Sequence, residues 1–93
     1  MISSEKEYLK RIRVVMKNRR VAIGLKQSEA AVRSGVNVFT LRHFEQKGDI
    51  SLENLLRLMH VYDMDFRMVK CIEDMSWWSV GELERADTRK KVR

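Results

Sequence analysis

The chain has 93 residues, of which 44% are hydrophobic and 34% are charged, a composition typical of one small globular domain and not of a disordered segment. It contains no proline and a single cysteine, which excludes proline-rich or collagen-like repeats, an internal disulfide and a cysteine-based zinc site. The formal net charge of +6 favours an anionic partner, with nucleic acid as the first candidate.

The positive charge is concentrated in the N-terminal half of the chain and at its C-terminal end. Residues 1–23 have a net charge of +5 and residues 24–48 of +2, whereas residues 49–75 have −3 and residues 76–93 have +2. Basic helices are often simply solvated faces, but this asymmetry favours a nucleic-acid-binding surface in the first half of the chain.

Two helices are predicted in the first third of the chain. Residues 5–23 form the first, because they place apolar side chains at helical spacing: Leu9, Ile12, Met16 and Ile23, with Val15 beside them. A short second helix is predicted at residues 27–34. Gly24 and Gly35 follow these helices, where a left-handed residue commonly ends a helix.

Three further helices are predicted, each with a side chain that can cap its first turn. Asn37 can cap a third helix that ends at Gly48, and Ser51 can cap a fourth. Asp65 can cap a fifth, whose apolar side chains are expected to face the core: Phe66, Val69 and Ile72. Residues 75–80 have the pattern of a short strand, and residues 79–82 that of a last capped turn. The predicted fold is all-α, a compact five-helix bundle with short connections.

Residues 20–45 have the order helix, short helix, tight turn and helix. Ala31 is expected where two helices cross closely, Gly35 in the turn, and Val36 and Leu41 between the two helices. This is the pattern of a helix-turn-helix, whose second helix enters the DNA major groove by its N-terminal end.

Residues 19–63 resemble the helix-turn-helix domain of Cro/cI-type (XRE-type) regulators, which have the lambda repressor-like fold. The resemblance is carried by Gly24-Leu25-Lys26-Gln27, Ser28-Glu29-Ala30-Ala31, Ser34-Gly35-Val36, Thr40-Leu41, Phe44-Glu45 and residues 51–58. Residues 41–52, and residues 79–85 with the basic tail after them, are similar to regulators of the HipB type, which are often encoded beside a HipA-type kinase toxin. We divide the chain into a helix-turn-helix DNA-binding domain at residues 1–74 and a C-terminal extension with a basic tail at residues 75–93.

The resemblance implies roles for individual positions. Gln27 would contact a DNA phosphate, and Arg20 and Glu45 would form a structural ion pair between the first helix and the reading helix. The side chains expected to face the groove are Asn37, Val38, Phe39, Thr40, Arg42 and His43. From their placement around the reading helix, Arg42 is expected to contact a base, and Lys26 and Lys47 are expected to contact phosphates.

The chain departs from the family pattern in three places. Lys26 stands where Ser or Thr usually caps the helix, so the capping box with Glu29 is expected to be lost. Ala30 replaces a larger core residue, so neighbouring side chains must fill the space. Val38 and Phe39 are apolar where polar base-reading residues are common. They can pack on thymine methyl groups, or Phe39 can instead fold back onto the domain or join a protein interface.

Apolar side chains also gather near the C-terminal end. Trp77 and Trp78 are adjacent and cannot both face one core from a regular element. Residues 64–83 are interpreted either as a satellite core or as a protein interface, for a dimer or a toxin, that includes Met64, Met68, Trp77 and Trp78. Cys71 is expected to pack in an apolar setting. The basic tail at residues 89–93 is either solvated or adds phosphate contacts.

The sequence has no Gly-rich phosphate loop, nucleophile elbow or paired-histidine spacing, so we predict no enzyme, metal site or cofactor. No apolar run approaches the ~18 residues of a membrane span, and we expect a cytoplasmic protein. The predicted function is a homodimeric repressor of an inverted-repeat DNA operator, the antitoxin and autoregulator of a HipBA-like operon, with a HipA-like kinase toxin or its partner subunit as a further partner. The alternatives are a phage-type repressor or restriction-modification controller without a toxin, and a protein-interaction module that has lost DNA binding.

Overall fold

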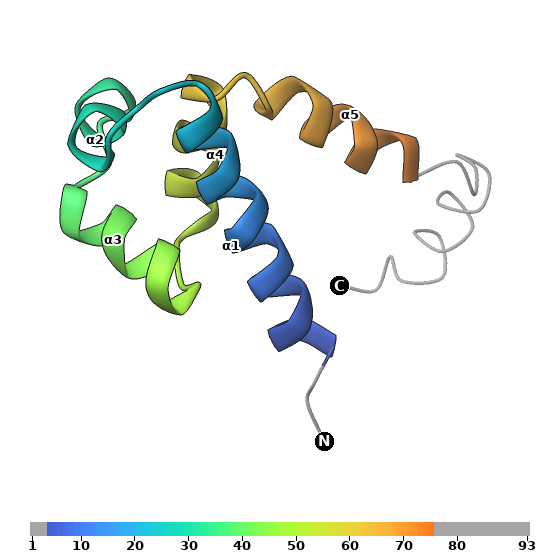
Figure 1. Ribbon diagram of the computed structural model, residues 1–93. Coiled ribbons are helices and arrows are strands. Elements are labelled where there is room, and N and C mark those ends of the chain that lie inside the picture. The colour runs from blue at the N-terminus through green and yellow to red at the C-terminus, as the bar shows by residue number, and fades with distance from the viewer. Residues whose placement is uncertain (1–3, 76–93) are drawn as a thin grey trace, which may run out of the picture.

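The computed structural model describes residues 4–75, which form five α-helices around one core (Figure 1). The helices are α1 (Ser4–Ala22), α2 (Gln27–Ser34), α3 (Val38–Lys47), α4 (Leu52–Val61) and α5 (Asp65–Asp74). The predicted all-α bundle of five helices is therefore confirmed. Trp77, Trp78, residues 76–80 of the predicted strand, the predicted last turn and the basic tail lie outside the described residues, and Met75 directly follows α5. No helix in the described part of the chain is long and apolar enough to cross a membrane.

The predicted capping residues begin α3 and α4, and glycines end α2 and α3. The Asn37 side chain accepts a hydrogen bond from the Phe39 N–H at 2.8 Å, and the Ser51 hydroxyl accepts one from the Asn54 N–H at 3.1 Å. Gly35 and Gly48 have φ angles of +76° and +94°, in the left-handed region where a side chain would be strained. These local signals lie within a few residues of each helix end, which is why the sequence placed the boundaries correctly.

Two other helix starts differ from the prediction. The capping box of α2 is half retained, because the Lys26 backbone N–H donates to Glu29 Oε1 at 2.8 Å. The reciprocal bond cannot form, since the Lys26 ammonium has no lone pair to accept one. The residue before α5 is Met64, so Asp65 is the first helical residue and not its cap. The Asp65 carboxylate instead lies 2.8 Å from His60 Nδ1, which joins the end of α4 to the start of α5.

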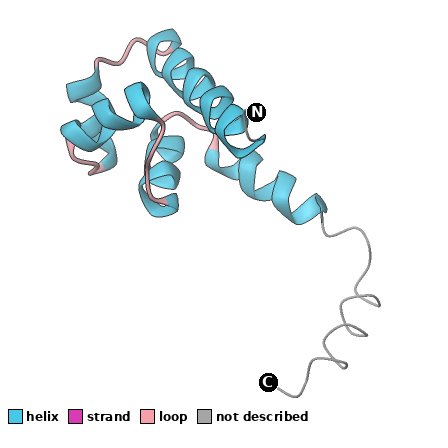
Figure 2. Cartoon of the chain, turned by 90° about the horizontal axis from the view of Figure 1, so that it is seen from below, coloured by secondary structure: helices cyan, strands magenta, loops and turns pink. Residues whose placement is uncertain are grey.

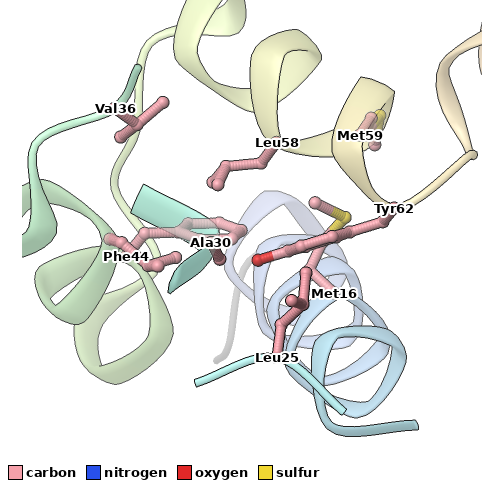
Figure 3. Close-up of a cluster of buried hydrophobic side chains, with 9 residues drawn as sticks. Met16, Leu25, Ala30, Val36, Phe44, Leu58, Met59 and Tyr62 are labelled. Carbon is pink, nitrogen blue, oxygen red and sulfur yellow. The ribbon is translucent and has the colours of Figure 1, made fainter. Parts of the chain in front are cut away.

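The core is assembled from helices α1 to α4, from Leu25 and Val36 in the connections between them, and from Tyr62, which follows α4 (Figure 3). Its largest fully buried side chains are Tyr62, Phe44, Met16, Leu41 and Leu58. Val36 and Leu41 are buried as predicted. The small residue Ala30 is fully buried too, and the Tyr62 ring points toward it (Figure 3). Tyr62 thus fills the space that a larger residue at position 30 would take.

The outward direction of α5 is the main departure from the predicted fold. This helix packs against α4 and leaves the rest of the bundle (Figures 1 and 2). The prediction that its apolar side chains face the core was wrong: Phe66 is 76% exposed, and Val69 and Ile72 are exposed as well. Met64 and Met68, at the start of α5, pack against the core, but the helix then runs away from the bundle, so Phe66, Val69 and Ile72 stay exposed.

Two more expected positions are exposed. The prediction that Cys71 packs in an apolar setting was wrong, because it lies on the surface of α5. Of the stripe predicted for the first helix only Met16 is buried; Leu9 and Ile12 on α1, and Ile23 just after it, are exposed. Helical spacing therefore identified the apolar faces correctly but did not show which of them the bundle covers.

Tyr62 should titrate far above an ordinary tyrosine. Burial raises the pKa of its hydroxyl from 10.0 to about 12. The unfolded chain releases this proton at lower pH than the folded chain does. The contribution of the protonated Tyr62 to the free energy of unfolding is therefore fully present below about pH 10. The free energy of unfolding should then fall by about 2–3 kcal/mol as the pH rises through 12. A Tyr8→Phe variant, which keeps Tyr62 as its single tyrosine, should show its tyrosinate absorbance rising near pH 12. A step near pH 10 while the helical circular dichroism is intact would contradict a buried hydroxyl.

Candidate nucleic-acid interface

The helix pair α2 and α3 is joined by a three-residue turn, residues 35–37, and both helices pack into the bundle. The inner side of α3 is held by the buried side chains of Leu41 and Phe44. Its outer side and its first turn carry no such contacts, and Phe39 is 69% exposed there. The bundle therefore anchors α3 from one side and presents the other side to solvent, which is the arrangement of a helix-turn-helix.

The ion pair expected from the family resemblance is present and joins α1 to α3. Arg20 Nε and Nη2 donate to the two carboxylate oxygens of Glu45 at 2.7 and 2.9 Å, and the side chains are only 9% and 4% exposed. Arg20 Nη1 also donates to the Leu25 carbonyl at 2.7 Å. The hydrogen bond to Glu45 raises the pKa of Arg20 above its ordinary value. This two-pronged geometry satisfies both charges away from water.

Gln27 belongs to the same cluster. Its side-chain amide donates to Glu45 Oε1 at 2.9 Å, so this oxygen accepts bonds from α1 and from α2. The sequence assigned Gln27 to a DNA phosphate, and the structure places its amide on Glu45 instead of on the open surface. The cluster of Arg20, Gln27 and Glu45 thus ties three helices together at the base of the candidate reading helix.

The accessible charges on α3 are all basic or titratable nitrogen groups. Arg42, His43 and Lys47 are exposed, whereas the single acid of this helix, Glu45, is buried and neutralised by Arg20. Lys26 is exposed at the start of α2. Asp49, which follows α3, lies 3.7 Å from His43 Nε2 and reduces the positive potential at that end. The surface over the middle of α3 consequently attracts anions.

The first turn of α3 is apolar and carries a cation on the next turn. The Arg42 guanidinium lies 5.5 Å from the centre of the Phe39 ring, a cation–π distance. Phe39 therefore does not fold back onto the domain, and it lies beside Arg42. Val38 and Thr40 are half-buried, and the Asn37 side chain is exposed but already engaged in capping the helix. Of the positions expected to face the groove, those with freely accessible side chains are Phe39, Arg42 and His43.

Two arginines of α1 bond to the ends of α3 and α4, whereas the sequence indicated them only as surface charge. Arg13 Nη1 donates to the Gln46 carbonyl at 2.9 Å, and Arg19 Nε donates to the Tyr62 carbonyl at 2.9 Å. Both acceptors lie at the C-terminal ends of helices, where carbonyls lack partners within the helix. The sequence shows that α1 is rich in arginine. It does not show that α1 crosses the ends of two other helices, because that arrangement depends on the tertiary structure.

Among residues 4–75, no group of three His, Cys, Asp or Glu side chains is placed to hold a metal ion. No family model matches the chain, and no match was found among the curated proteins or the solved structures that were compared with it. Evidence about function therefore comes from the geometry and charge of the residues themselves.

Arg20→Met should lower the melting temperature, because it leaves the Glu45 carboxylate buried without its cation. Breaking a buried pair in this way costs about 3 kcal/mol or more. Adding Glu45→Leu should recover much of the loss but not all, since the Gln27 amide and the Leu25 carbonyl still lose their partners. Thermal unfolding followed by circular dichroism measures both effects.

The matched control is Lys17→Met, which removes an exposed cation from the same helix and should leave melting nearly unchanged. If Arg20→Met melted like this control, the pair would contribute nothing to stability and Arg20 would be available for other contacts.

Proposed function

We propose that this chain is a sequence-specific DNA-binding transcriptional repressor that inserts the N-terminal half of α3 into the major groove. The observation that carries the proposal is the charge of α3: its one carboxylate is buried against Arg20, and its accessible ionisable side chains are Arg42, His43 and Lys47. Phosphates repel carboxylates on a helix that faces a duplex, and burying Glu45 removes this repulsion without losing the structural pair.

The proposed contacts follow from the position of each group. Arg42 lies one turn inside the start of α3 and contacts a base edge, where a guanidinium recognises guanine with two hydrogen bonds. Lys26, at the start of α2, and Lys47, at the end of α3, contact phosphates on either side of the groove. Phe39 packs on thymine methyl groups and, through its ring, holds Arg42 in place. Asn37, Gln27, Val38 and Thr40 act chiefly by shaping and capping the helix pair.

The biological setting is proposed from the sequence resemblance. The protein acts as a homodimer on an inverted-repeat operator in the cytoplasm, and as the antitoxin and autoregulator of a HipBA-like toxin–antitoxin operon. An antitoxin of this kind also holds a kinase toxin or its partner subunit.

A protein-interaction module that no longer binds DNA is the second candidate, and the exposed Phe39 is the observation that favours it. A large apolar ring at the start of the helix fits a protein pocket as well as a groove. The cation of Arg42 over that ring, together with the exposed Lys26 at the start of α2 and Lys47 at the end of α3, favours DNA over protein.

Selection from a random-sequence duplex library tests the function without knowledge of the operator. Duplexes retained by the purified full-length chain should converge on an inverted repeat, with half-site centres about 10–10.5 base pairs apart or a multiple of that spacing. A library that stays random, with weak and salt-independent retention, would exclude sequence-specific DNA binding and favour the protein-interaction module.

Arg42→Ala and Lys26→Ala should weaken binding in different ways. Losing Arg42 should cost about 1–3 kcal/mol on the selected duplex and relax preference at one base pair of each half-site. Losing Lys26 should weaken binding to all duplexes alike. The slope of the logarithm of affinity against the logarithm of salt concentration should become shallower by about 1, as expected for one lost phosphate contact. Fluorescence anisotropy at several salt concentrations measures both, with Lys70→Ala on α5 as a control that should change neither. Equal losses from Arg42→Ala on matched and mismatched duplexes would mean that Arg42 contacts the backbone.

A further inference from the structure

Two apolar surfaces on this chain have no partner within residues 4–75. The first, the α5 stripe, consists of three exposed side chains at helical spacing: Phe66, Val69 and Ile72. They belong to the helix that leaves the bundle (Figure 2). The second, the α1 groove, runs between α1 and the junction of α4 with α5, and is lined by Tyr8, Ile12, Val15, Met16, Met59 and Met64. It continues past Val15 along Met68 at the base of α5.

The charges around the two surfaces are complementary. Arg11 and Arg19 line the α1 groove on the side of α1, and the opposite charges of Asp63 and Arg67 line its far end, so the net charge of its lining is positive. On α5, Asp65 is four residues before Val69 and Glu73 is seven residues after Phe66, so both acids share the face of the stripe. Taken as whole helices, α1 has a net charge of +5 and α5 of −1. The stripe therefore has the sign that the groove attracts.

We propose that the α1 groove of one chain receives the α5 stripe of a second copy, and that the exchange is reciprocal. The inference rests on the proposed function for the identity of the partner, because an inverted repeat requires two copies. Two chains related by a two-fold axis close both contacts at once: each α5 lies with its stripe against the other chain's α1, and its inner side next to the other α5. The outward course of α5 gives each helix the reach that such an exchange needs.

The area is sufficient for a stable dimer. With about 150–250 Å² for the aromatic side chains Phe66 and Tyr8 and less for the aliphatic ones, the accessible parts of the stripe and the groove amount to at most about 600 Å² of apolar surface per chain. A standard interface buries about 800 Å² per partner, of which a little over half is apolar.

The same charges argue against the chain's own C-terminal segment as the occupant of the groove. Residues 76–93 have a net charge of +2, with five cations. All five cations lie within residues 85–93, and this basic part would meet Arg11 and Arg19, whereas the stripe brings Asp65 and Glu73 to them.

Sedimentation equilibrium of the full-length chain without DNA tests the exchange. Phe66→Lys places a cation in the stripe, facing the groove arginines, and Val15→Glu places an acid in the groove, facing the stripe acids. Each variant should raise the dimer dissociation constant at least about 30-fold. Because Phe66 is 76% and Val15 is 54% exposed, both variants should keep the helical circular dichroism of the parent chain.

Matched controls separate the surfaces from a general effect of added charge. Val14→Glu changes the neighbouring residue of α1, which is 46% exposed but does not line the groove. Val32→Lys changes an exposed valine on α2. Both controls should dimerise like the parent chain. Equal loss of dimer in the controls, or a parent chain that stays monomeric at every concentration, would overturn the proposal.

Mixing the two variants gives the decisive result. Neither forms an intact contact with itself, but in the mixed dimer the unaltered α5 stripe of the Val15→Glu chain meets the unaltered groove of the Phe66→Lys chain. The second contact then pairs the new lysine with the new glutamate. The equimolar mixture should therefore recover dimers that neither variant forms alone. No recovery would exclude the exchange and leave a direct contact between two stripes as the alternative.

DNA binding is measured separately on a duplex with one half-site and on the full inverted repeat. Phe66→Lys should keep the half-site affinity of the parent chain and lose at least about 10-fold on the full site, because bivalent binding is lost. If no duplex binds, the proposed function fails while the sedimentation result still decides the dimer surface. Equal affinity of parent and variant on the full site would contradict a dimer formed through this surface on DNA.

Discussion

The bidentate pair of Arg20 and Glu45 is the interaction on which the rest of the helix pair depends. It places two opposite charges out of water, and Gln27 and the Leu25 carbonyl complete their hydrogen bonds. A buried ion pair is stable only when nearly all of its polar atoms have hydrogen-bond partners. The pair therefore fixes α1, the start of α2 and the end of α3 in one relative arrangement. The same pair removes the single carboxylate of α3 from the surface, which links the stability of the fold directly to the charge of the proposed reading helix.

The second constraint is space. Ala30 is small, and Tyr62 fills the position beside it from the end of α4. Only the methionines at the start of α5 pack against the core, and the remainder of the helix runs away from it. The bundle is therefore complete without most of its last helix, and the apolar face of that helix is available to another molecule. An 11.1 kDa chain with so small a core gains stability from such an association.

Three arginines of α1 show how one basic helix can serve as structural support. Arg13, Arg19 and Arg20 each donate to a group at a helix end or within the buried pair. Their charges were counted from the sequence as part of a nucleic-acid surface, yet their guanidinium groups are directed to the protein. The basic surface proposed for DNA is consequently smaller than the net charge suggests, and it is centred on α3 and the start of α2.

The sequence by itself determined the five helices, the caps at Asn37 and Ser51 and the glycine helix ends, because these features depend on residues within one turn of each other. It also placed Arg20 with Glu45, through the family resemblance. Only the tertiary structure decided which apolar faces are covered, that the Gln27 amide bonds to Glu45, and that Phe39 stays outside beside Arg42. The physical reason is that helical spacing is the same for a face that packs inside its own chain and for one that packs on a partner. The distinction depends on the volume already filled by residues distant in sequence, here Tyr62 against Ala30.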